Sequence, residues 1–151
     1  MKKIIILAAV IVAGIAANAA AFNWSATRIY GPDNALLSNA TASLYCDALG
    51  KDALSTASVS GGTIASTEFT VASAVAGTSY DFYFVVETGG KAFTSAAKPA
   101  DAMSVGVSTV AFGNQKSATQ ASGAWAAVPE PTSGLLLLLG MAGLALKRKR
   151  A

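Results

Sequence analysis

The clearest alternation of apolar side chains in the chain lies between Tyr80 and Glu87. Successive side chains of a strand point to opposite faces, so one face of this segment carries Tyr80, Phe82, Phe84 and Val86. Tyr83 and Val85 make the centre of the other face apolar as well. Aromatic and β-branched residues at this period predict an interior β-strand.

A two-residue turn follows this strand. Gly89 and Gly90 supply the positive φ values that a tight hairpin requires. The turn would pair Thr88 with Lys91 and place Val86 opposite Phe93, so the turn and the hydrophobic pattern predict the same register.

Weaker patterns predict further strands over residues 23–30, 43–46, 63–71 and 104–112. In the last of these, a bulge near Ser108 would bring Val105, Val107, Val110 and Phe112 onto one face. Residues 46–57 fit a short helix instead, and residues 38–44 favour neither structure. Several short strands with few helical segments predict a mainly β protein, a small antiparallel β-sandwich.

The N-terminal segment has the pattern of a secretory signal peptide. Lys2 and Lys3 precede an apolar run over residues 4–17, and small residues then offer cleavage before Ala20 or before Phe22. An uncleaved anchor helix is the alternative, but the run is shorter than the roughly 20 apolar residues that a span needs. We therefore expect an N-terminal signal helix that signal peptidase removes.

The C-terminal segment combines three features in a fixed order. Pro129, Glu130 and Pro131 precede an apolar span over about 132–146, and a basic cluster follows it, formed by Lys147, Arg148, Lys149 and Arg150. This tail closely resembles the PEP-CTERM sorting tail of Gram-negative bacteria, which exosortase, a membrane cysteine protease, recognises. An ordinary single-pass anchor with a proline hinge is the alternative interpretation.

Both ends predict one topology. The basic cluster should stay in the cytoplasm, so the body of the protein lies across the inner membrane. The resemblance implies an anchored precursor with a C-terminal transmembrane helix, which exosortase processes at Pro129–Pro131 for the cell surface or the extracellular space. We divide the chain into a signal peptide (1–21), a β-rich exported domain (22–117), a linker (118–128) and the sorting tail (129–151).

Charge excludes one class of partner. The net charge of +3 comes from the two ends of the chain. Between the ends there are seven acidic residues and only five basic ones, which are Arg28, Lys51, Lys91, Lys98 and Lys116. Those acids are Asp33, Asp47, Asp52, Glu68, Asp81, Glu87 and Asp101. A mildly acidic domain without a basic cluster gives no support for nucleic-acid binding.

The sequence offers few residues of the kinds that catalyse reactions. The chain has no histidine, which removes Ser-His-Asp, Cys-His and histidine-metal arrangements. Cys46 is the single cysteine and is interpreted as a buried thiol, with an intermolecular disulfide as the alternative. A carboxylate pair for glycoside hydrolysis is formally available, but scattered acids are usually solvated. We predict no catalytic residues, no metal and no cofactor.

One binding function stays open beside a non-enzymatic surface or matrix role. Trp24, Tyr30, Tyr45 and Tyr83 would form a stacking platform for exopolysaccharide if several of them are exposed. Aromatic residues at strand parity are more often part of a core.

Overall fold

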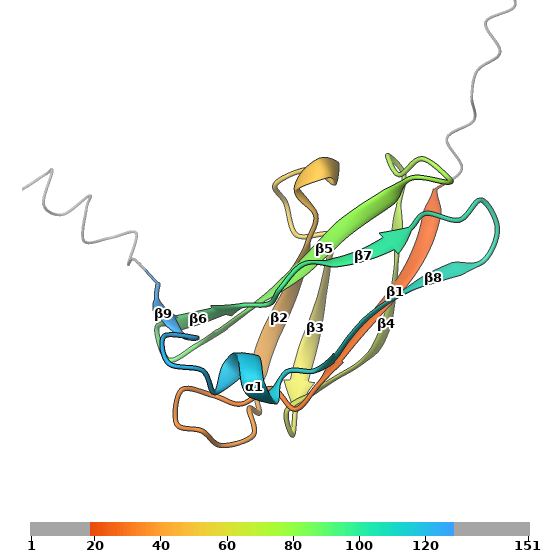
Figure 1. The fold of residues 1–151 in the computed structure, drawn as a ribbon. Helices are drawn as coiled ribbons and strands as arrows, with labels where there is room; N and C mark the ends of the chain where they lie inside the picture. Colours follow the sequence, from red (N-terminus) through yellow and green to blue (C-terminus); the bar gives the residue numbers. More distant parts are fainter. Residues whose placement is uncertain (1–18, 129–151) are drawn as a thin grey trace, which may run out of the picture.

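The computed structural model describes residues 19–128, which form a β-domain of nine strands with two short helical turns (Figure 1). The strands are β1 (Ala20–Thr27), β2 (Ala40–Tyr45), β3 (Ser55–Ser60), β4 (Thr63–Val71), β5 (Ser79–Thr88), β6 (Lys91–Thr94), β7 (Lys98–Asp101), β8 (Val107–Asn114) and β9 (Ala126–Ala127). The turns are a 3₁₀ helix, η1 (Asp47–Leu49), and a helix α1 (Lys116–Thr119).

The strands belong to one sheet with the order β8-β1-β4-β3-β2-β5-β6-β9, while β7 pairs with β5. Neighbouring strands are antiparallel except β1 and β8, which are parallel. The sheet curls so that its inner face encloses the core (Figure 1). The mainly β prediction is therefore confirmed, whereas the two separate layers of the predicted sandwich are replaced by one continuous curled sheet.

The hairpin between β5 and β6 has the predicted register. Thr88 pairs with Lys91 and Val86 with Phe93, and Gly89 and Gly90 have φ values of 55° and 72°. Two consecutive positive φ values match the twist of the flanking strands.

Strand β5 exchanges partners halfway along its length. Its first half pairs with β7 and its second half with β6. At the junction, Ser95 donates its N–H to the carbonyl of Phe84, and the N–H of Phe84 donates to Ser95 Oγ at 3.0 Å. This buried serine satisfies the backbone that the interrupted ladder would leave without partners.

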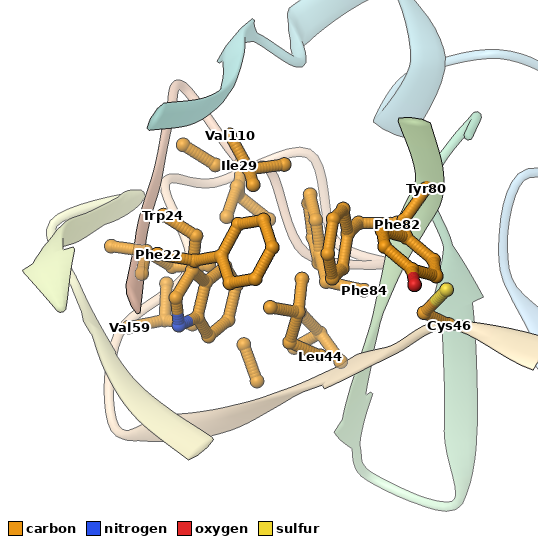
Figure 2. Close-up of a cluster of buried hydrophobic side chains, with 14 of the residues drawn as sticks. Phe22, Trp24, Ile29, Leu44, Cys46, Val59, Tyr80, Phe82, Phe84 and Val110 are labelled. Atoms are coloured by element: carbon orange, nitrogen blue, oxygen red, sulfur yellow. The ribbon is translucent and has the colours of Figure 1, made fainter. Parts of the chain in front are cut away.

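Aromatic side chains dominate the core (Figure 2). Phe22 and Trp24 enter from β1 and Phe82 and Phe84 from β5, and all four are fully buried. Phe84 lies at the centre, with its ring 4.8 Å from Phe112 and 6.1 Å from Trp24 between centroids. Buried aromatic pairs at such distances add about 0.5–1.5 kcal/mol each to their area burial.

Strand β8 differs from its prediction. The irregularity lies at Phe112, between the pairs Ser25–Ala111 and Ala26–Gly113, and not near Ser108. Ser108, Val110 and Phe112 face inward, whereas Val105 is 86% exposed. The polar Ser108 can point inward because its hydroxyl donates a hydrogen bond to the carbonyl of Asp101. The strand therefore needs no bulge at this position.

Two other segments also differ. The predicted helix over 46–57 is reduced to η1, because the chain turns back and Ser55 pairs with Leu44. Residues 118–128, expected as a linker, contain the end of α1, Trp125 and β9, which pack on the sheet.

The predicted signal helix and transmembrane helix fall in residues 1–18 and 129–151, outside the described residues. Within residues 19–128, no helix has the length and apolar character needed to cross a membrane.

Candidate functional site

The outer face of β2 and β5 carries a pair of tyrosines. Tyr45 and Tyr83 are directly opposite each other in the ladder, and their rings stack at 5.6 Å between centroids with 20° between planes. Both side chains are half-buried, because odd-numbered residues of β5 point away from the core. This pair is the part of the predicted aromatic platform that the fold brings together.

A carboxylate fixes one of the two rings. The Tyr83 hydroxyl donates a hydrogen bond of 2.9 Å to Asp47 Oδ1, which η1 holds just beyond the end of β2. The hydrogen bond to Asp47 raises the pKa of Tyr83, because a carboxylate acceptor stabilises the protonated phenol. Sequence reasoning missed this pair because Asp47 was assigned to a possible helix.

A hollow of about 350 Å³ adjoins each tyrosine. The hollow on the Tyr45 side is lined by Asn39, Ala40, Thr41, Ser43, Val85 and Glu87 besides Tyr45. The one on the Tyr83 side is lined by Cys46, Asp47, Ala48, Ser79, Tyr80, Asp81 and Ala97 besides Tyr83. Both hollows therefore combine a ring with hydroxyl and carboxylate oxygens, the groups that contact sugars.

The other predicted platform residues lie elsewhere. Trp24 is fully buried and donates its Nε1–H to Ser55 Oγ at 3.1 Å. Tyr30 is half-buried beside α1, where its backbone N–H donates to Thr119 Oγ1. A four-residue platform is therefore not formed.

The remaining candidates take structural or solvated positions. Cys46 is a free thiol that is only 1% exposed, which agrees with the buried-thiol interpretation. Residues 19–128 contain no group of three or more potential metal-ligating side chains.

The C-terminal end of the domain is fastened to β6. Strand β9 pairs Ala126 with Ala92 and Ala127 with Lys91, and the N–H of Val128 donates to the carbonyl of Gly90 at 3.0 Å. The Trp125 ring lies 5.8 Å from that of Phe93, and its buried Nε1–H finds no acceptor within residues 19–128. Trp125 lies in the predicted linker, and the structure places its ring on the domain.

The predicted sorting residues begin directly after this strand. Pro129, Glu130 and Pro131 and the basic cluster Lys147, Arg148, Lys149 and Arg150 lie outside the described residues.

Comparison with known families identifies the tail. Residues 127–150 match the family described as the PEP-CTERM protein-sorting motif, as the sequence predicted. Neither the curated proteins nor the solved structures contain a match to this chain. The motif indicates an exported, membrane-anchored precursor of a Gram-negative bacterium that depends on an exosortase.

Proposed function

We propose that the chain is a non-enzymatic surface or extracellular-matrix protein whose β-domain is exported, anchored by its C-terminal span and released or transferred by exosortase. The observation that carries the proposal is the match of the sorting motif over residues 127–150, at the C-terminal end of a domain with its own core. An N-terminal signal peptide, cleaved before Ala20 or before Phe22, supplies the export step in this account.

The proposal assigns separate tasks to two parts of the tail. The residues Pro129, Glu130 and Pro131 serve recognition by the protease, and the apolar run with its basic cluster retains the precursor in the membrane. The fold supports this separation, because the core cluster is built within residues 20–125.

The test uses one substitution and one truncation in a host with active exosortase. Glu130→Ala should leave membrane insertion intact and block processing, since the span and its positive charges remain. A chain that lacks residues 135–150 should be folded and soluble after export. Normal processing of Glu130→Ala, or membrane fractionation of the truncated chain, would refute the corresponding assignment.

The stacked tyrosines favour a second function, binding of exopolysaccharide. Tyr45 and Tyr83 present partly exposed ring surface beside two polar hollows, and aromatic rings offer the apolar faces of sugars a stacking surface. Double replacement by alanine should then abolish retention of the purified domain on the producing strain's exopolysaccharide. Thr70→Ala is a control with an exposed side chain on β4, which β3 separates from β2. Equal retention of all three proteins would remove this candidate.

A further inference from the structure

The sorting motif and the folded domain overlap by two residues. The family match begins at Ala127, which belongs to β9, and includes Val128, whose N–H donates to Gly90. Residues at the start of the matched motif thus take part in the β6–β9 ladder (Figure 1).

A protease and β6 compete for this backbone. Proteins that recognise extended peptides do so largely through main-chain hydrogen bonds along the peptide. One edge of β9 is paired with β6, and within the described residues β9 is the last strand of the sheet. A cleft that contacts both edges of the chain just ahead of Pro129 therefore requires β9 to leave β6, whereas a protease that contacted only the outer edge would not.

The attachment of β9 is built to be weak. The strand has two residues and both are exposed, so its ladder offers few hydrogen bonds. Its main side-chain anchor is Trp125 on Phe93. The buried indole N–H of Trp125 has no acceptor within residues 19–128, which makes this anchor less favourable. Short, exposed elements with few buried contacts open locally far more often than a core strand.

We propose that Trp125 and β9 form a clamp that holds the start of the sorting motif against β6, and that opening of this clamp limits processing by exosortase. Trp125 acts as a positioning residue, because it lies outside the matched residues and acts through β9. This inference rests on the proposed exosortase processing of the tail.

The test removes the clamp without touching the matched residues. The N–H of Val128 points to β6, and antiparallel pairing gives the N–H of Ala126 the same direction. Ala126→Pro removes that donor, and Ala126→Ser is the matched control that keeps it. In pulse-labelled cells with active exosortase, the precursor of Ala126→Pro should be processed roughly two- to tenfold faster than wild type, as loss of one hydrogen bond implies, and Ala126→Ser at the wild-type rate.

Trp125 gives an independent variant. Trp125→Ala should also accelerate processing. Trp125→Phe should be processed at the wild-type rate or more slowly, because phenylalanine keeps the contact with Phe93 and lacks the buried indole N–H. A role of Trp125 in stability alone would not produce this order of rates. Hydrogen exchange at the Val128 amide of the full-length protein in detergent should rise in the two releasing variants.

Three outcomes decide the proposal. Faster processing together with faster exchange supports the clamp. Unchanged or slower processing in variants whose Val128 amide is released would overturn it, and so would unchanged exchange in both. Glu130→Ala separates this from the proposed function: if it blocks processing while Ala126→Pro has no effect, the clamp alone fails.

Discussion

Strands β5 and β9 bind the two edges of the same strand, β6, yet they are held by different forces. Strand β5 has ten residues, and Phe82, Phe84 and Val86 are fully buried beneath it. Strand β9 has two exposed residues and relies on one neighbouring ring. We infer from this difference that the β5–β6 pairing contributes to the stability of the domain, whereas the β6–β9 pairing controls access to the sorting tail.

The largest expected effect lies on the β5 side. Phe84→Ala removes a fully buried ring that contacts Trp24, Phe93 and Phe112, and should lower the free energy of unfolding by about 3–5 kcal/mol. Val85→Ala, the next residue on the outer face, should cost about 1 kcal/mol or less. Urea unfolding of the exported domain measures both. Equal losses of unfolding free energy in the two variants would contradict the burial of one face of β5 and the partial exposure of the other.

A smaller effect is expected at the first strand. The sequence offers cleavage before Ala20 or before Phe22, but Ala20 is buried and paired with Val71, and Ala21 pairs with Val107. Only a chain that begins at Ala20 keeps β1 complete. Removal of residues 20 and 21 should cost about 1–2 kcal/mol of stability through lost burial and ladder hydrogen bonds.

Mass spectrometry of the exported protein gives the natural end. We expect Ala20 as its first residue. Recovery of intact residues 1–17 would refute the signal peptide, and recovery of Phe22 as the first residue would refute the preference for a complete β1.

The smallest effect concerns the outer face. The hydrogen bond to Asp47 raises the pKa of Tyr83, so Asp47→Asn should lower that pKa toward the ordinary tyrosine value of about 10. The stabilisation from this pair is complete below the ordinary value and is lost as pH rises through the raised one. Ultraviolet titration follows the phenol, and Asp47→Asn should lower Tm near neutral pH only slightly, because the hydrogen bond is exposed to solvent. Identical titration of both proteins would contradict the pairing.

The strands that could be predicted from the sequence are those with a strong apolar pattern, such as β5. The segment from Tyr80 to Phe93 could be placed with its register because apolar period, β-branched residues and a glycine turn all favoured one structure. Residues 63–71 were likewise bounded as observed. Strand β3 was missed because its small polar residues have weak preferences, and it is a strand through its pairing with β2 and β4.

The candidate sites divide in a similar way. The sorting motif could be found from residues 129–150 alone, since its signal is linear. The Tyr45–Tyr83 pair and its Asp47 partner depend on which residues meet across β2 and β5. The sequence places Trp125 and β9 in a linker, because this alanine-rich segment has no helical or strand periodicity of apolar residues. Its position on the domain depends on the contact between Trp125 and Phe93.

The central claim is that a stable β-domain carries a separable sorting tail. It is tested most directly by mass spectrometry of the C-terminus of the protein from cells with and without the exosortase. We expect the intact tail on a membrane-bound protein without the enzyme, and a C-terminus near Pro129–Pro131 on a folded domain with it. The same intact C-terminus in both strains would contradict the account.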